Sequence, residues 1–332
     1  MVYVHVPFCK TFCTYCDFYS ERSSEFGPYL LSLEREVESR RAEIASGTLK
    51  TLYIGGGTPS LLPIDAVRRI VEAVNDGPYR EFTFEANPED IQTAGYVDSL
   101  LELGVNRISM GVQSLDDDVL KWMGRRHDAL RARKAYALLR ERGVPSVSLD
   151  LIFGIGGVPR RSVEATVRGF IELRPDHISA YQLGIEEGSD LARLLEAGRY
   201  EECGEDECAD QYAMICSLLS EAGYHHYEIS NWALPGHEAV HNSAYWSREP
   251  YVGLGPGAHS LSRRDGVERR SWNSKDLSDW TSSGETLGAE EIREETVMLG
   301  LRRDIGVEID GRTVKIKESD WFKSDSIIAD LV

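Results

Sequence analysis

Over its first 180 residues, the chain alternates between short apolar runs and longer segments with helical spacing. The apolar runs are residues 2–6, 51–54, 81–85, 106–110, 146–152 and 177–180. The helical segments are residues 29–44, 64–74, 93–103, 130–142 and 161–173. Short apolar runs are typical of strands buried in a parallel sheet, and their alternation with helices implies right-handed crossovers. Six units are too few for a closed eight-stranded barrel, so the sequence predicts an α/β fold with an open, partial (β/α)6 barrel.

Polar or glycine-rich residues stand at or near the end of every predicted strand. In chain order they are the Cys9–Cys16 segment, Gly55-Gly56-Gly57-Thr58-Pro59, Glu85-Ala86-Asn87-Pro88, Gly111-Val112-Gln113-Ser114, Asp150 and Tyr181-Gln182. In βα barrels the carboxyl ends of the strands build the active site. We therefore expect these residues to meet at one mouth of the barrel.

Cys9, Cys13 and Cys16 follow the first predicted strand with the spacing C-x3-C-x2-C. Three thiolates on one loop can hold three irons of a [4Fe-4S] cluster and leave the fourth iron open to a small molecule. A structural zinc site needs four closed ligands, and no fourth Cys or His lies in this loop. An odd trio of such closely spaced cysteines also pairs poorly as disulfides. The spacing therefore favours the cluster.

This cysteine run resembles the opening of radical S-adenosylmethionine (SAM) enzymes. The resemblance implies that the amino and carboxylate groups of SAM chelate the open iron. It also implies that an electron from the cluster cleaves SAM to give a 5′-deoxyadenosyl radical. The cofactor carries out such chemistry. The chain positions the cofactor, excludes water from it and sets the electrostatic environment.

The composition argues against a nucleic-acid partner. The chain has 55 acidic and 37 basic side chains and a formal net charge of −18, whereas phosphate binding needs clustered Lys and Arg. No apolar run approaches the ~20 residues that span a bilayer, so we expect no integral membrane segment. The N-terminus has no secretion signal, so we expect a cytoplasmic protein. The sequence leaves open whether the protein forms a homodimer.

Several residues at the predicted mouth have both a functional and an ordinary interpretation. The glycines at 55–57 either form a simple turn or let the SAM amino group approach closely, because glycine has no Cβ. Glu85 and Asp150 are either surface acids or, because they lie on apolar strands, groups that face a ligand cavity. Arg125 is either a solvated helix charge or a ligand contact.

Polar and aromatic residues dominate three segments in the second half of the chain. These segments are residues 227–232, 241–246 and 251–259. His241 begins the second segment and His259 ends the third. The pattern predicts either a loop that binds a ligand or a packed loop, and the sequence leaves both open.

Five motifs together narrow the resemblance from the radical SAM superfamily to one family within it. They are His5-x-Pro7-Phe8-Cys9, Tyr15-Cys16-Asp17-Phe18, Gly55-x-Gly57-Thr58-Pro59, Gly111-Val112-Gln113-Ser114 and Gly253-Leu254-Gly255. Over residues 2–300 the chain is similar to the oxygen-independent coproporphyrinogen oxidase group. The oxidases carry a further cysteine where this chain has Phe18. Phe18 and the run His241-Asn242-x-x-Tyr245-Trp246 instead resemble the HemW heme chaperones of that group. The chain starts eight residues before Cys9, so we expect no N-terminal arm like the one that oxidases use over their substrate.

The resemblance implies roles for residues by their position. Cys9, Cys13 and Cys16 would bind the cluster. Contacts with the cluster-bound SAM would come from Tyr3, Gly57 and Glu85. Positions that line a second SAM site in the oxidases are Tyr15, Thr58, Pro59, Gln113, Arg125, Asp150 and Gly184.

Two positions depart from the oxidase pattern. Gly184 stands where the oxidases carry alanine, and His259 stands where they carry an isoleucine that touches SAM. These departures leave open whether one or two SAM molecules bind. For heme, the resemblance implies His241 as the first candidate ligand and His259 as the second.

The C-terminus predicts a shortened appendage. Residues 290–302 predict one amphipathic helix, residues 308–316 a hairpin with an Asp-Gly turn, and a last helix starts near Asp320. Too few residues remain for the winged-helix-like domain that usually ends this family. We therefore divide the chain into a radical SAM partial barrel (1–183), a heme or substrate-side extension (184–302) and a shortened winged-helix-like remnant (303–332).

The sequence as a whole favours a heme chaperone over an enzyme with turnover. We expect it to bind heme, to transfer heme to apo-acceptor proteins, and to carry a [4Fe-4S] cluster and SAM. The alternative is an oxygen-independent coproporphyrinogen III oxidase, which oxidatively decarboxylates a porphyrin precursor. A structural iron-sulfur protein without SAM is disfavoured, because Gly57, Glu85 and Asp150 accompany the cysteines.

Overall fold

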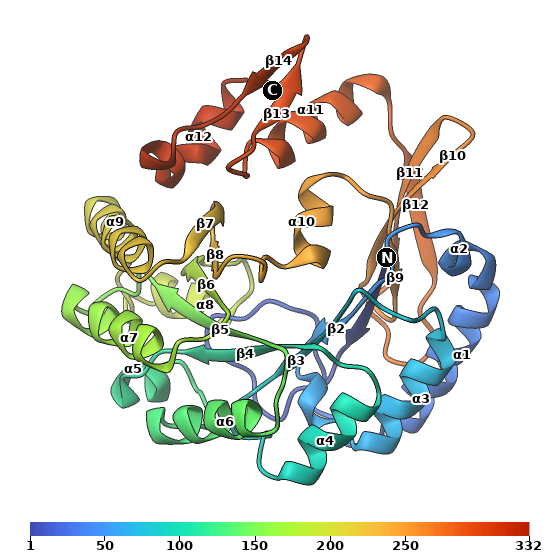
Figure 1. Ribbon diagram of the computed structural model, residues 1–332, viewed down its shortest axis with the longest axis horizontal. Coiled ribbons are helices and arrows are strands. Elements are labelled where there is room, and N and C mark those ends of the chain that lie inside the picture. Colours follow the sequence, from blue (N-terminus) through green and yellow to red (C-terminus); the bar gives the residue numbers. More distant parts are fainter. Residues whose placement is uncertain (332) are drawn as a thin grey trace.

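The computed structural model describes residues 1–331, and its centre is one curved nine-stranded sheet (Figure 1). The strand order is β7-β8-β6-β5-β4-β3-β2-β1-β9. The first six strands are β1 (Val2–Val6), β2 (Thr51–Gly56), β3 (Glu81–Ala86), β4 (Arg107–Gln113), β5 (Ser146–Phe153) and β6 (His177–Gln182). Within these six, each strand from β1 to β5 pairs in parallel with the next one along the chain. The prediction of six parallel strands in an open barrel is confirmed.

Helices follow the strands and cover the outer side of the sheet (Figure 1). They are α1 (Gly27–Ser39), α2 (Arg41–Ser46), α3 (Ile64–Val74), α4 (Ala94–Glu102), α5 (Asp117–Trp122), α6 (Ala129–Glu141) and α7 (Arg160–Leu173). The single helix predicted over residues 29–44 is wrong, because the chain leaves helical geometry at Arg40 and forms α1 and α2. Helix α5 was not predicted, although Asp116 caps its first amides.

The two faces of the barrel strands differ in polarity because successive side chains point to opposite faces. Outward-facing residues such as Leu52, Phe84 and Met110 are fully buried under the helices. Inward-facing residues are polar along several strands. They include Tyr53, Thr83, Glu85, Ser109, Ser148, Asp150 and Ser179. The interior of the barrel is therefore polar, while the core lies between the sheet and the helices.

Segments after residue 183 complete both edges of the same sheet. They are α8 (Asp190–Glu196), α9 (Glu205–Glu221), β7 (His225–Glu228), β8 (Asn231–Ala233), α10 (Val240–Trp246) and β9 (Val252–Leu254). Strand β8 pairs antiparallel with β6, and β9 pairs parallel with β1. The predicted 184–302 extension is therefore continuous with the barrel sheet at both of its edges.

The rest of the chain forms a smaller sheet and the appendage. The elements are β10 (His259–Arg264), β11 (Val267–Asn273), β12 (Ser282–Thr286), α11 (Ala289–Gly300), β13 (Val307–Ile309), β14 (Arg312–Val314) and α12 (Ser324–Ala329). The predicted hairpin with an Asp310-Gly311 turn is confirmed, and both turn residues have positive φ. Trp321 is buried and packs edge-on against His226 of β7, which attaches the appendage to the sheet. No helix within residues 1–331 is long and apolar enough to cross a membrane.

Helix α10 closes the amino end of the barrel from the inside (Figure 1). The buried carboxylate of Glu81, the first residue of β3, accepts hydrogen bonds from the amides of Val240 (2.7 Å) and His241 (2.8 Å). These two amides begin the helix and have no partner within it. Glu81 therefore fixes the position of α10 against β3.

The role of Glu81 predicts a loss of stability when its carboxylate is removed. Glu81→Ala should lower the free energy of unfolding by about 2–4 kcal/mol, because two buried amides lose a charged acceptor. Glu285→Ala, a change in a half-exposed ion pair on β12, should alter it by less than about 1 kcal/mol. Urea unfolding followed by circular dichroism measures both values, and equal losses would contradict this role.

Candidate functional site

One cavity of about 850 Å³ opens at the carboxyl ends of the barrel strands. The predicted site residues that line it are Cys9, Cys13, Tyr15, Cys16, Gly57, Thr58, Pro59, Glu85, Gln113, Arg125, Asp150 and Gly184. The structure therefore brings these residues to one mouth, as the strand alternation predicts. Tyr3, His241 and His259 are the three predicted residues outside its lining.

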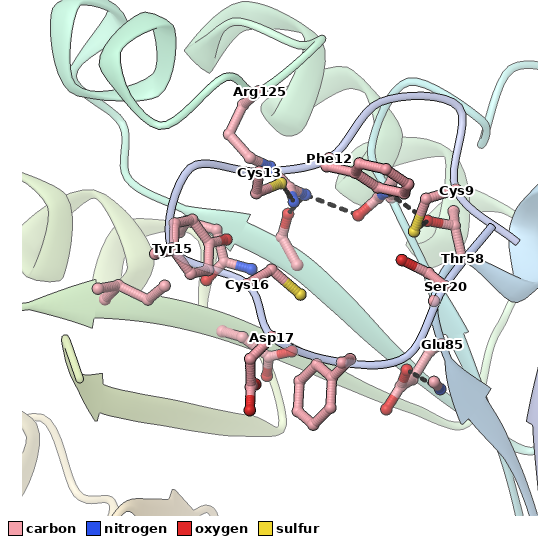
Figure 2. Close-up of a pocket in the computed structure, with 18 of the residues that line it drawn as sticks. Cys9, Phe12, Cys13, Tyr15, Cys16, Asp17, Ser20, Thr58, Glu85 and Arg125 are labelled. Carbon is pink, nitrogen blue, oxygen red and sulfur yellow. Dashed lines mark hydrogen bonds between the residues drawn. The ribbon is translucent and has the colours of Figure 1, made fainter. Parts of the chain in front are cut away.

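The three cysteines lie on one loop that is tied at both ends and at its tip (Figure 2). Backbone hydrogen bonds from Cys9 to Glu21 (3.1 Å) and from Glu21 to Pro7 (2.6 Å) close the loop next to β1. The amide of Thr14 donates to Met123 at the end of α5. The loop therefore has a fixed position over the strand ends.

The three thiols of this loop are free and partly buried. In a [4Fe-4S] cluster each thiolate binds its own iron, so three thiols on one loop can serve three irons. Burial raises the pKa of the Cys16 thiol to about 11, so ligation there releases a proton.

Arg125 is partly buried and hydrogen-bonded to the cysteine loop, so its interpretation as a solvated charge is wrong. Its Nη1 donates to Cys13 Sγ (3.4 Å), and its Nη2 donates to Asn87 Oδ1 and to the Gly111 carbonyl (2.6 Å each). Its Nε lacks a partner among the described residues. Arg125 thus links the loop to the ends of β3 and β4 and places a positive charge beside a thiol (Figure 2).

The glycines after β2 have a packing role that their sequence does not reveal. A Cβ on Gly57 would lie 2.8 Å from the Phe8 carbonyl and 3.0 Å from the Val6 carbonyl. A Cβ on Gly55 would lie 2.9 Å from the Glu85 carboxylate. The missing side chains therefore allow the glycine loop to approach β1 and β3, whatever their effect on a cofactor.

Two partly buried carboxyl groups, Glu85 and Asp150, face the cavity. Glu85 accepts hydrogen bonds from Tyr53 Oη (2.7 Å) and the Gly56 amide (3.0 Å), and burial raises its pKa to about 7. Asp150 accepts from Ser109 (3.1 Å) and Ser148 (3.3 Å), and burial raises its pKa as well. Buried carboxyls of this kind regain their charge when a cation binds nearby, so the site favours an ammonium or sulfonium ligand.

Tyr3 lies behind the cavity wall. Its hydroxyl pairs with His5 Nδ1 at 3.0 Å, and its ring lies 5.9 Å from the ring of Tyr53. Burial, followed by the charge of Glu85, raises its pKa. Tyr3 therefore supports the residues around Glu85 in this structure and does not line the cavity itself.

The expectation that His241 lies on a loop is wrong. His241 belongs to α10 and is fully buried, with Nδ1 paired to Thr51 Oγ1 (2.9 Å) and Nε2 to Tyr245 Oη (3.0 Å). Burial lowers its pKa to about 3. Both ring nitrogens are engaged in packing α10 against β2, so neither is presented to a ligand in this structure. Asn242 is the residue of this helix that lines the cavity.

His259 is exposed at the start of β10, stacked against Trp272 with ring centres 6.3 Å apart. No hydrogen bond from its ring is found within residues 1–331. A Cβ on Gly257, two residues earlier, would lie 3.7 Å from the side chain of Tyr19, which ends the cysteine loop. His259 therefore lies on a segment that packs beside the mouth.

Sequence reasoning missed the inward-facing residues deeper in the barrel. The cavity is also lined by Thr83, Arg107, Ser109, Ser179 and Asn242. The available signal was the polar residue at every second position of β3 to β6. The interpretation of these strands as continuous apolar runs concealed that pattern.

Comparisons with known proteins identify the family of this chain. The family model of the radical SAM superfamily matches residues 3–169. The heme chaperone HemW of Bacillus subtilis (strain 168) is 34% identical over 325 residues, which cover 92% of this chain and 84% of the relative. HemW of Mycobacterium tuberculosis (strain H37Rv) is 33% identical over 348 residues, which cover 99% of this chain and 87% of the relative. Coproporphyrinogen III oxidase (HemN) from Escherichia coli has a similar fold, with a TM-score of 0.77, 21% identity, and coverage of 92% of this chain and 75% of that one.

The parallel barrel and its cysteine-lined mouth are those of a radical SAM protein. Within that superfamily, the chain belongs to the HemW family. Membership of the superfamily implies a [4Fe-4S] cluster and SAM, and the residues present fit both. Three thiols share one tied loop, Arg125 offers charge to a thiolate, and Glu85 and Asp150 offer carboxylates to a cationic ligand.

The loop geometry predicts which cysteines hold iron. Cys9→Ser, Cys13→Ser and Cys16→Ser should each sharply lower the iron content after anaerobic reconstitution, because each thiolate binds its own iron. Cys203→Ser, Cys208→Ser and Cys216→Ser should leave it nearly unchanged, since these cysteines are not part of the cavity lining. Iron and sulfide analysis measures the outcome. A Mössbauer spectrum of a fully Cys-ligated or two-iron centre would contradict the open-iron assignment.

The raised pKa of Glu85 predicts that SAM binding strengthens with pH. Deprotonation above about pH 7 creates the carboxylate that accepts a hydrogen bond from the SAM amino group, a contact worth about 1.5–3 kcal/mol. Titrations of SAM into the reduced cluster, followed by electron paramagnetic resonance, should show higher affinity at about pH 8 than at about pH 6. Glu85→Gln should weaken binding and remove this dependence.

A loss of folding would not account for weaker SAM binding by Glu85→Gln. A carboxyl with a raised folded-state pKa lowers the stability of the folded chain as pH increases through this range. Glu85→Gln removes this penalty, so it should not destabilise the protein at about pH 8. An unchanged pH dependence of SAM binding in Glu85→Gln would contradict the assignment.

Proposed function

We propose that this protein binds heme and delivers it to apo-acceptor proteins, and that it carries a [4Fe-4S] cluster and SAM at its mouth. The observation that carries the proposal is its similarity, over nearly the whole chain, to proteins named heme chaperone HemW. The structure supports it with an aromatic rim at the cavity and with an exposed histidine, His259, two residues after a glycine that packs against Tyr19.

The rim supplies flat apolar surface for a macrocycle. Phe18 is 67% exposed, Phe12 is 42% exposed and Tyr181 is 42% exposed, and all three line the cavity. Exposed large aromatic residues gathered at one opening are characteristic of binding surfaces. Phe18 stands where the oxidases have a further cysteine, so a stacking surface takes the place of a thiol.

His259 is the candidate axial ligand that the structure favours over His241. Its side chain is exposed, whereas the ring of His241 is buried with both nitrogens engaged. Partial burial, followed by the charges of Arg270 and Lys275, lowers the pKa of His259. A neutral imidazole is the form that binds heme iron, and this environment favours it at neutral pH.

The mouth residues have distinct tasks in this proposal. Cys9, Cys13 and Cys16 would hold the cluster, and Glu85 would accept a hydrogen bond from the amino group of SAM. In the superfamily, the reduced cluster supplies the electron that cleaves SAM. Arg125 holds the cysteine loop against β4 and offsets thiolate charge.

The proposal predicts saturable heme binding that depends on His259. Anaerobic titration of heme should shift the Soret band and saturate at about one heme per chain. His259→Ala should abolish or strongly weaken this shift. His225→Ala provides the matched control, because His225 is also exposed but lies on β7 at the opposite edge of the sheet.

The alternative function gives a different result in the same preparation. Reconstituted protein would decarboxylate coproporphyrinogen III when SAM and a reductant are added, and it would show no saturable heme binding. That pair of results would overturn the proposal in favour of the oxidase. An equal loss of the Soret shift in His259→Ala and His225→Ala would contradict His259 as the ligand.

A further inference from the structure

The cavity extends below the mouth into the barrel. Its lining includes Thr83, Arg107, Ser179 and Asn242, which come from β3, β4, β6 and α10. We call these four residues the barrel floor. They lie deeper than Glu85 because Thr83 and Ser179 are inner positions of their strands and Arg107 begins β4. Neither the proposed heme ligand nor the cysteine loop belongs to this part of the cavity.

Arg107 carries a buried charge without an acidic partner. It is 4% exposed, and no carboxylate within residues 1–331 forms an ion pair with it. Its hydrogen bonds, to Ser146 Oγ (3.1 Å) and the His237 carbonyl (3.5 Å), both use Nη1. Nη2 and Nε therefore remain available. A buried charge is costly unless it is paired, so the site is suited to an anionic partner.

The acids on the neighbouring strands are engaged with other groups. Glu81 of β3 accepts the two amides that begin α10. Asp150 of β5 accepts from Ser109 and Ser148, and the charge of Arg107 acts on it from a distance to oppose the rise in its pKa that burial causes, without a direct ion pair. The positive charge of Arg107 nevertheless reaches its surroundings, because burial and then Arg107 lower the pKa of His177. The neutral imidazole of His177 therefore lies near the floor, with both ring nitrogens paired to Ser148 and Tyr227.

Thr83 provides a second, independent sign of a ligand. It is the direct register partner of Arg107 on the adjacent strand. Thr83 is fully buried, and its Oγ1 has no hydrogen-bond partner in the part of the chain that the structure describes. An unpaired buried hydroxyl is unfavourable, and here it lines the same cavity as the Arg107 guanidinium, which has no ion-pair partner.

We propose that the barrel floor is a binding site for a carboxylate, with Arg107 as its cationic clamp and Thr83 as an additional donor. The guanidinium presents paired N–H groups that match the two oxygens of a carboxylate. The carboxylate comes either from a side arm of a bound porphyrin or from a small free carboxylate. The porphyrin source rests on the proposed heme function, whereas the free source does not.

Propionate tests the site without heme. Saturation-transfer NMR on the reconstituted protein should show saturable binding of propionate and none of propionamide, which has the same shape without the charge. Arg107→Gln should weaken propionate binding by at least about tenfold, as expected for the loss of one charge-assisted hydrogen bond. Arg168→Gln, which removes an exposed charge from the outer surface of α7, should not change it.

Heme and heme dimethyl ester distinguish the two sources. If a porphyrin arm occupies the floor, the wild type should bind heme at least about tenfold more tightly than the ester, and Arg107→Gln should lose this preference. Equal binding of heme and ester, together with saturable propionate binding, assigns the floor to a free carboxylate. If heme does not bind at all, the proposed function is overturned. The propionate titration then decides by itself whether the barrel floor binds a carboxylate.

Thr83→Val keeps the test decisive if Arg107→Gln does not fold. The isosteric change removes an unpaired hydroxyl, so the protein should remain at least as stable while propionate binding weakens severalfold. Absence of propionate binding by the wild type, with no preference for heme over its ester, would overturn the proposal. Unchanged binding of both probes in Thr83→Val and Arg107→Gln would also overturn it.

Discussion

Parallel pairing of β1 to β6 is the constraint on which the site depends. Because the six strands run in one direction, their carboxyl ends meet at one edge of the sheet. The cysteine loop, the glycine loop, Glu85 and Arg125 are far apart in the chain and reach one cavity for this reason. If one of these strands ran in the opposite direction, its polar end would lie at the barrel floor and not at the mouth. The site therefore requires that all six strands run in parallel.

The same strands explain why the interior is polar. Their outer faces bury apolar side chains under the helices, which provides the core, and this leaves the inner faces free for polar groups. Most of these groups pair with one another, as Asp150 does with Ser109 and Ser148. Glu85, Arg107 and Thr83 keep unmet charge or hydrogen-bonding capacity. The barrel is therefore stable as a fold yet incomplete in its polar contacts, which is what a binding cavity requires.

The sequence predicts local features better than contacts between distant segments. Strand positions and the cysteine loop follow from short patterns, so their prediction succeeded for β1 to β6. The prediction that His241 lies on a loop failed because its environment is created by packing between α10 and β2. The two contacting residues are 190 positions apart in the chain. The break at Arg40 also depends on distant residues, since its side chain bonds Gly253 and Ser260. The residues of the barrel floor were missed because a period of two was concealed within apolar runs.

The central claim, that the mouth carries heme for delivery and not for chemistry, is tested most directly by following heme and SAM together. Reconstituted, heme-loaded protein would be mixed anaerobically with SAM, a reductant and apomyoglobin as a generic acceptor. The account predicts that heme moves to the acceptor while its porphyrin stays chemically unchanged and without stoichiometric formation of 5′-deoxyadenosine. Retention of heme, together with conversion of added coproporphyrinogen III and matching release of 5′-deoxyadenosine, would contradict it.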